Sequence, residues 1–575
     1  MTETANAEAG TWESAVVLDI DRVATRAILL DVVDDNARFV GLSSSPSSTS
    51  PSLAVDVGAG IIGALKRLEE QVGRRFIDGD RVITPQQVAG DGADVYYVTG
   101  MPADPIRIAV IAVGDGPLAD ALPRALRHTM THIADARVDL PRQGLAFSQS
   151  TVAGWLKRVA PSTVVMVFAG GSSEAWAAAI DAVAEAAATT PLNQGIVVAD
   201  EAHQQAVAQA LSGAVELSGI DPTEYREIEI AEAVETEMRT QYNARVQAMP
   251  GFALLPSMKF VDKVQATQAV VAFLHRRMQR KIIALSIGDG ALIHVGLRHG
   301  ATTIFRADRD LGFSARALIE LDAERTRRWL PDDRSDADIR HWLLNRSLRP
   351  LTQIDAPADI EMAGAVEREL FAALVAETGL EATPDVELIA VEPRFGLRDP
   401  ARELLAVLDG VMPDPADGLV TVALDVEGLM GAAGTLSTAA PAYAAELIEQ
   451  DCLSPLASCI VVRGRAEDGA LAVRGEIRYD SGETRRFSVP FGSLLALPLN
   501  EGESANLTLT PEPEFSIGGR PAGQEVIFED EHRIFGGEIG VVIDARGRPV
   551  ELPADPTTRA ARLRTWVEDI SGRNE

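Results

Sequence analysis

The residues of this chain with the clearest potential for chemistry gather in two short turns between apolar runs. The first turn carries two acids, Asp19 and Asp21, and is followed by a hydroxyl group and a base, Thr25 and Arg26. Carboxylates hold the water shell of a magnesium ion, and guanidinium and hydroxyl groups bind phosphate oxygens. The second turn, near Gly288, is poorer in such groups.

Each turn lies inside the same pattern of three apolar runs. The first copy runs from Ala15 to Gly41 and the second from Lys281 to Arg306. In both, an apolar run ends in a turn, returns as a second run, turns again and returns as a third. Helical segments follow each copy, so the sequence predicts two antiparallel meanders in an α/β protein.

Two such meanders resemble the skeleton of the fold shared by actin, sugar kinases and heat-shock chaperone ATPases. The resemblance implies a duplicated α/β core in which the first turn of each meander grips the phosphates of ATP. Carried onto this chain, it implies a nucleotide and magnesium site made of Asp19, Thr25, Arg26, Gly288 and Asp310.

The same resemblance identifies residues that would impair such a site. Asp21 stands where a glycine normally lets the backbone approach the phosphate, and a fixed carboxylate facing a triphosphate is repulsive. Ser286 stands where the second turn normally has an aspartate. Asp289 and Leu292 replace small and hydroxyl residues in that turn.

The adenine side shows a third departure from the pattern. A Gly-Gly turn is expected there, because side chains would collide with the base and ribose. This chain has Glu392, Pro393 and Arg394 instead. Together the three departures predict a pseudo-ATPase.

Composition limits the classes of partner. The formal net charge of −31 argues against binding nucleic acid or an anionic membrane surface. Cys452 and Cys459 are too few for a disulfide framework, and their spacing fits no usual zinc pattern. The polar N-terminus lacks the features of a signal peptide, and no apolar run reaches membrane-spanning length. We therefore expect a soluble, cytoplasmic protein.

The 575 residues leave room for several domains. We predict a disordered N-terminus (1–14), a first actin-like lobe with an inserted α/β segment (15–275), a second lobe (276–450) and a C-terminal mostly-β domain (451–575). A Ser/Pro-rich stretch at 43–52 is predicted to be a mobile loop, and a helix is predicted near 117–132. The last domain ends in an amphipathic helix capped at Thr557 or Thr558.

Several motifs resemble a narrower family, the MutL-like proteins associated with adenosylcobalamin-dependent glutamate mutase. These motifs are LDIDRVATRAILLD, VVMVFAGG, NARVQAMPGF, ALSIGDGALIHV, RADRDLGFSAR and RWLP, between Val16 and Ala440. The resemblance implies an actin-fold ATPase that acts as a chaperone or reactivating factor for the mutase. The segment from Gly536 to Pro553 resembles an extension carried by longer members of that family.

Weaker candidates each have a structural alternative. Residues 170–173 (Gly-Gly-Ser-Ser) could bind an anion at a helix N-terminus, or form a tight turn and a cap. His294 and His299 lie close in sequence, but on opposite faces of a strand, which disfavours a metal site. Residues 544–548 (DARGR) could bind phosphate or pair internally. Trp329 and Trp342 are predicted to pack in a core.

Three functions remain open at this level. The first is a non-catalytic or weakly catalytic scaffold or chaperone that binds a partner protein, with no cofactor. The second is an ATP- and magnesium-dependent reactivating factor for an adenosylcobalamin-dependent mutase. The third is an actin-like protein that polymerises. We favour the first, without nucleic acid or membrane as partner, and homo-oligomerisation stays open.

Overall fold

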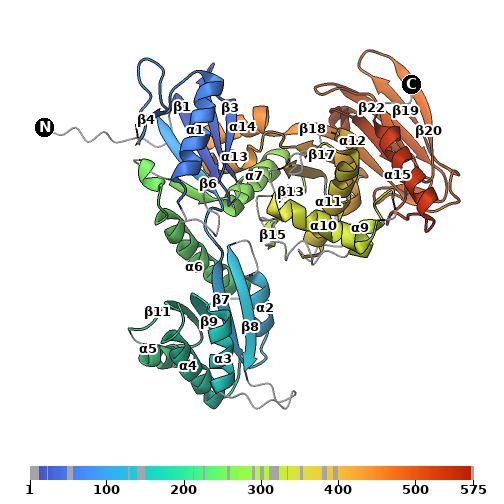
Figure 1. Cartoon of the computed structure of the whole chain (residues 1–575). Helices are drawn as coiled ribbons and strands as arrows, with labels where there is room; N and C mark the ends of the chain where they lie inside the picture. Colours follow the sequence, from blue (N-terminus) through green and yellow to red (C-terminus); the bar gives the residue numbers. More distant parts are fainter. Residues whose placement is uncertain are drawn as a thin grey trace. The chain divides into compact units, whose positions relative to one another are not determined.

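The computed structural model describes residues 12–22, 24–47, 56–79, 81–126, 130–138, 149–211, 213–223, 227–255, 259–287, 292–297, 304–309, 323–332, 334–349, 352, 354–377, 385–392 and 399–571. The chain forms two compact units (Figure 1). One combines Met1–Gly100 with Gly251–Glu575, and the other is Met101–Pro250.

The first repeat of the larger unit is a five-stranded sheet. Its strand order is β12-β6-β1-β2-β3. The meander is antiparallel, and β6 and β12 run parallel to β1. The strands are β1 (Ser14–Ile20), β2 (Ala24–Val33), β3 (Asn36–Pro46), β6 (Val95–Gly100) and β12 (Lys259–Asp262).

Strand β3 corrects one prediction. Residues 43–46 of the predicted mobile loop are paired with β2, up to the contact of Ala24 with Pro46. The Ser43 hydroxyl is buried and donates to the carbonyl oxygen of Ala64 in α1 (Gly58–Val72) at 2.6 Å, so this polar side chain is satisfied inside the protein by a helix far along the chain.

The second repeat has the same strand order, β15-β14-β13-β16-β17. Again the first three strands form an antiparallel meander and the last two run parallel to β13. The predicted duplicated actin-like fold is therefore confirmed by topology. The strands are β13 (Ile282–Ile287), β14 (Leu292–Leu297), β15 (Ile304–Arg309), β16 (Leu388–Glu392) and β17 (Leu419–Leu424).

The C-terminal β region continues the sheet of the second repeat. Strand β17 pairs with β18, which pairs with β26 and β23, and β26 pairs with β21. A second sheet, in the order β20-β19-β22-β24 with β25 beside β22, closes this region. The strands are β18 (Ser454–Gly464), β19 (Leu471–Tyr479), β20 (Thr484–Pro490), β21 (Leu494–Leu497), β22 (Ser504–Pro511), β23 (Phe515–Ile517), β24 (Val526–Phe528), β25 (Ile534–Phe535) and β26 (Gly540–Asp544).

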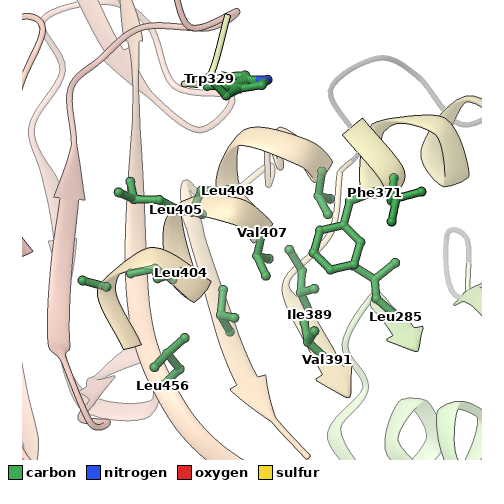
Figure 2. Close-up of a cluster of buried hydrophobic side chains, with 14 of the residues drawn as sticks. Leu285, Trp329, Phe371, Ile389, Val391, Leu404, Leu405, Val407, Leu408 and Leu456 are labelled. Carbon is green, nitrogen blue, oxygen red and sulfur yellow. The ribbon is translucent and has the colours of Figure 1, made fainter. Parts of the chain in front are cut away.

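Helices cover both faces of the second repeat's sheet. On one face, apolar residues of the two sheets pack with α7 (Lys263–Met278), α13 (Met430–Ala439) and α14 (Pro441–Leu447). The other face packs against α11 (Pro357–Glu377) and α12 (Pro400–Val411), where Phe371, Val407 and Ile389 meet (Figure 2). The remaining elements of this unit are α1 (Gly58–Val72), β4 (Ile77–Asp78), β5 (Arg81–Val82), α9 (Ala323–Arg327), α10 (Asp336–Leu348) and α15 (Pro556–Ile570), with short helical turns at Phe252–Leu254, Ile448–Cys452 and Asp530–His532.

The start of α15 corrects a second prediction. The cap is Asp555, whose carboxylate accepts from the backbone N–H of Thr558 at 2.7 Å, and Pro556 is the first helical residue. Thr557 and Thr558 therefore lie inside the helix. A proline with its fixed φ suits the first helical position, which moves the cap one residue before it.

The smaller unit is a doubly wound parallel sheet in the order β11-β10-β9-β7-β8. The helix predicted near 117–132 ends at Ala125, and Thr131–Val138 is an edge strand. The elements are β7 (Ile106–Val113), α2 (Leu118–Ala125), β8 (Thr131–Val138), α3 (Gln149–Val159), β9 (Thr163–Phe168), α4 (Ser173–Ala187), β10 (Gln194–Val198), α5 (Glu201–Leu211), β11 (Glu216–Ile220) and α6 (Glu227–Gln247). No helix in the described ranges is long and apolar enough to cross a membrane.

Two glutamates, one on α11 and one on α12, are buried without a hydrogen-bond partner among the described residues. Glu367 is 0% exposed and Glu403 is 1% exposed. None of their four carboxylate oxygens has a hydrogen-bond partner among the described residues. Burial raises the pKa of both groups, and that of Glu403 reaches about 8 although Arg368 opposes the shift. The neutral form is therefore favoured at Glu403 near neutral pH.

We expect the Glu403→Gln variant to flatten the pH dependence of stability. A carboxyl with a raised pKa contributes full stability below its unfolded pKa of about 4.5 and loses that contribution as pH rises toward 8. Urea unfolding between pH 5 and 9, roughly the span over which the group titrates, should show the variant more stable than the natural chain by a few kcal/mol at the alkaline end. The exposed Glu427→Gln, just beyond β17, is the control, and equal pH profiles for all three proteins would refute the assignment.

Candidate functional site

The candidate site lies where the carboxyl ends of parallel strands from both repeats come together. Asp19 and Ser286 are the penultimate residues of β1 and β13, Glu392 ends β16, and Asp425 follows β17. Lys263 begins α7 directly after β12. Ligands of open α/β sheets bind at this edge, so these are the positions from which a ligand would be held.

Lys263 is the central base of the site. The carboxylate of Asp262 accepts from the backbone N–H of Gln265 at 2.9 Å and so fixes the first turn of α7. Lys263 is 2% exposed, and its Nζ lies 3.3 Å from Glu392 and 3.6 Å from Asp21. Burial lowers the pKa of Lys263, but the charges of Glu392, Asp19 and Asp21 outweigh burial and raise it.

Arg26 supplies the second positive charge. Antiparallel pairing of β1 with β2 places it opposite Asp19, and the two side chains form an ion pair. A second ion pair joins Arg26 to Glu392 at 3.2 Å. Burial opposes the charged form, yet the acids around the guanidinium raise its pKa well above the ordinary value.

Glu392 joins the two repeats. Besides Arg26 and Lys263 of the first repeat, it accepts a hydrogen bond from the Ser286 hydroxyl, its neighbour in the parallel register of β13 with β16. Burial would raise its pKa, but Lys263, Arg26 and Ser286 together lower it to about 2. Its contribution to stability is present above about pH 4.5 and is lost as pH falls toward 2.

Asp425 completes the acidic side of the site. Its carboxylate accepts from the backbone N–H groups of Leu429 and Met430, at 2.6 and 2.7 Å, and so holds the start of α13. Burial and the charge of Glu392 raise its pKa to about 7 in spite of these two bonds. Asp425 can therefore take up or release a proton near neutral pH.

Of the five residues predicted to bind nucleotide, the structure brings Asp19 and Arg26 together. Thr25 is buried and points elsewhere, since its hydroxyl lies 3.0 Å from that of Ser47. Gly288 and Asp310 lie outside the described residues, as do Asp289, Pro393, Arg394 and His299. The side chains of Leu292 and His294 are also outside the description.

The described residues fit a phosphate chain poorly. Arg26 and Lys263 bring two positive charges, which Asp19, Asp21 and Glu392 already match with one negative charge in excess. A phosphate would have to displace Glu392 and approach the carboxylate of Asp21. Both steps carry an electrostatic cost in a partly dry site.

Lys263, Glu392 and Asp425 were not predicted to act together. The sequence identifies Glu392 only as an obstacle to adenine, because a single acid after a strand does not reveal its partner. The one local signal for Lys263 is its place after an Asp cap at the start of an apolar helix.

For the weaker candidates at residues 170–173 and 544–548, the described contacts agree with the structural alternatives, a turn with a helix cap and an internal ion pair. Gly171 is needed for packing, because a Cβ there would lie 2.6 Å from Val113, and Ser172 caps α4 by accepting from the Ala175 N–H at 3.2 Å. Asp544 is bonded to Arg546 and Arg548 at 2.9 and 2.6 Å. Trp329 is buried in the core of the second repeat, with Trp342 packed against that core.

Comparison with known proteins yields distant matches only. Neither a protein-family model nor a curated protein matches the chain. Among solved structures, it is similar to component A of the (R)-2-hydroxyglutaryl-CoA dehydratase of Acidaminococcus fermentans, with 9% identity and a TM-score of 0.26 over 75% of this chain and 98% of that one.

Two further solved structures give similar values. Nucleotide-free acetone carboxylase has 10% identity and a TM-score of 0.28, over 84% of this chain and 81% of that one. Nucleotide-free diol dehydratase-reactivating factor has 9% identity and a TM-score of 0.29, over 76% of this chain and 99% of that one. Likenesses this distant do not decide a function, and the strand order of the two repeats is what assigns the fold.

We expect the Lys263→Met variant to be strongly destabilised, because it leaves Glu392 and Asp21 buried with less compensating charge. Removing one partner of a buried pair costs about 3–5 kcal/mol. The double variant Lys263→Met with Glu392→Gln should recover part of that loss. Urea unfolding at pH 7 measures both effects.

Arg277→Met is the matched control for this prediction. Arg277 lies on the same helix and forms an ion pair with Glu449 at the surface. Its removal should cost less than about 1 kcal/mol. A Lys263→Met variant as stable as this control would show that the buried ion pairs do not hold the repeats together.

Proposed function

We propose that this chain is an actin-fold scaffold or chaperone that binds a partner protein without turning over ATP. The observation that carries the proposal is the position of Glu392, whose carboxylate bridges Arg26 and Lys263. These two bases are the groups that a nucleotide phosphate would use. In this proposal Glu392 takes the place of that phosphate.

The proposal explains how the repeats stay together without a bound nucleotide. Arg26 and Lys263 belong to the first repeat and Glu392 to the second, so each ion pair crosses from one repeat to the other. The ionised carboxylate of Glu392 is bonded to Arg26, Lys263 and Ser286, so its negative charge is always present between the repeats. Closure of the two repeats is then a property of the chain itself.

The partner we propose is an adenosylcobalamin-dependent mutase. This choice rests on the resemblance of the sequence motifs to MutL-like proteins. The net charge of −31 is compatible with a partner that presents a basic surface, because complementary charge speeds encounter.

We expect no change in the thermal unfolding of the natural chain when magnesium and ATP are added at millimolar concentration. A ligand present at a hundred times its dissociation constant adds about 2.7 kcal/mol to the free energy of unfolding, which gives a visible rise in Tm. A clear rise, confirmed by titration calorimetry, would contradict the proposal.

The Glu392→Gln variant should gain affinity for phosphates. The substitution removes the internal anion while keeping the shape of the side chain, so Arg26 and Lys263 become available. We expect a Tm rise with tripolyphosphate in this variant and none in the natural chain. Glu427→Gln, an exposed acid beyond β17, is the control. A variant that folds but ignores tripolyphosphate would argue against Glu392 as the occupant of the phosphate position.

One observation favours a second candidate, the ATP-driven reactivating factor. Asp19 is buried, yet its Oδ1 has no hydrogen-bond partner among the described residues. That oxygen remains available for the water shell of a magnesium ion. If a purified chain hydrolyses ATP, the Asp19→Asn variant should abolish the activity, and activity that survives this change would exclude the candidate.

A further inference from the structure

A small pocket lies apart from the candidate site, where α11, α12 and α15 meet the segment after α9. Its volume is about 40 Å³, which is room for roughly three water molecules. The lining includes two indoles and three guanidinium groups, which belong to Trp329, Trp566, Arg368, Arg402 and Arg564. A volume this small excludes a nucleotide and admits a group of a few heavy atoms.

Arg368 and the two indoles of the lining belong to a larger array of rings and charges that extends behind the pocket. Arg368 lies over the Trp329 ring at 5.2 Å, and Arg546 lies over the Trp566 ring at 4.7 Å. Asp409 forms an ion pair with each of the two arginines, at 2.9 Å in both cases. Because every member is held on two sides, the guanidinium of Arg368 has a fixed orientation.

The arginines of the pocket retain unused donors. Arg368 is 9% exposed and donates through Nε to Asp409, and no described residue bonds its terminal nitrogens. Arg402 likewise uses Nε for Asp399. Arg564 is exposed and has no partner in the described part of the chain. The one acid in the lining is Glu361, so donors outnumber acceptors.

We propose that this pocket binds a carboxylate carried on a short apolar stem. The terminal nitrogens of Arg368, Arg402 and Arg564 match the two oxygens of a carboxylate, and the indoles with Leu405 and Leu563 receive the stem. The carboxylate belongs either to a free small acid or to a glutamate side chain of a partner protein. This site is independent of the proposed function at Glu392.

The test is tryptophan fluorescence of the full chain, because two of its six tryptophans line the pocket. Propionate, added at constant ionic strength, should give a saturable change, and the neutral analogue 1-propanol should give none. N-acetylglutamic acid α-amide, which presents a side-chain carboxylate, distinguishes the two sources. Binding of propionate supports a free acid, and binding of the glutamate derivative alone supports a partner's side chain.

Variants at the rim of the pocket complete the test. Arg402→Ala and Arg564→Ala should each weaken binding about tenfold, because each removes a charge-assisted hydrogen bond. Arg559→Ala, the same charge change elsewhere on α15, should leave binding unchanged. The proposal is overturned if neither acid binds, if 1-propanol gives the same change, or if all three variants bind alike.

Discussion

The larger unit depends on the ion pairs that Glu392 makes with Arg26 and Lys263. These charges are withdrawn from water where the carboxyl ends of both sheets meet, so each requires a partner to remain ionised. Glu392 has three partners, and its lowered pKa keeps it charged throughout the physiological range. The same residues that weaken a phosphate site, Glu392 and Asp21, are the ones that compensate Lys263. In the proposed function, the carboxylate of Glu392 supplies the negative charge that a bound phosphate would otherwise bring to Arg26 and Lys263.

A second constraint fuses the C-terminal β region to the second repeat. Hydrogen bonding continues from β17 through β18 to β26, so the boundary between them is not a flexible linker. Beneath that sheet, the buried guanidinium of Arg546 joins Asp409 of α12 to Asp544 of β26. The C-terminal helix adds Trp566, whose indole donates to the carbonyl oxygen of Gly492 at 2.8 Å. The β region and the second repeat therefore form one continuous body, and the proposed carboxylate pocket lies at their junction.

Buried acidic groups are stabilised differently at Glu392 and at the pair formed by Glu367 and Glu403. Glu392 is paired with two bases, whereas Glu367 and Glu403 of the second repeat have no hydrogen-bond partner among the described residues. Arg368, which opposes the rise in their pKa, is also bonded to Asp409 and lines the proposed pocket, so the two glutamates and the pocket share this arginine. Burial favours the protonated, neutral form of both carboxyl groups. Deprotonation therefore destabilises the packing of α11 against α12, which makes the stability of this region depend on pH.

The sequence by itself determined the parts of this protein that depend on local patterns. Apolar runs of strand length, separated by acidic or glycine turns, predicted both meanders and the α/β class, because alternation and turn chemistry act over a few residues. Asp19 and Arg26 face each other because the first two strands of the first meander, β1 and β2, form an antiparallel hairpin. The tertiary structure alone decided the remainder of the site. Lys263 and Glu392 are 129 residues apart, and neither residue's neighbours in sequence indicate the other. Their pairing exists because two sheets present their carboxyl ends to a common space, where burial makes an unpaired charge too costly to remain.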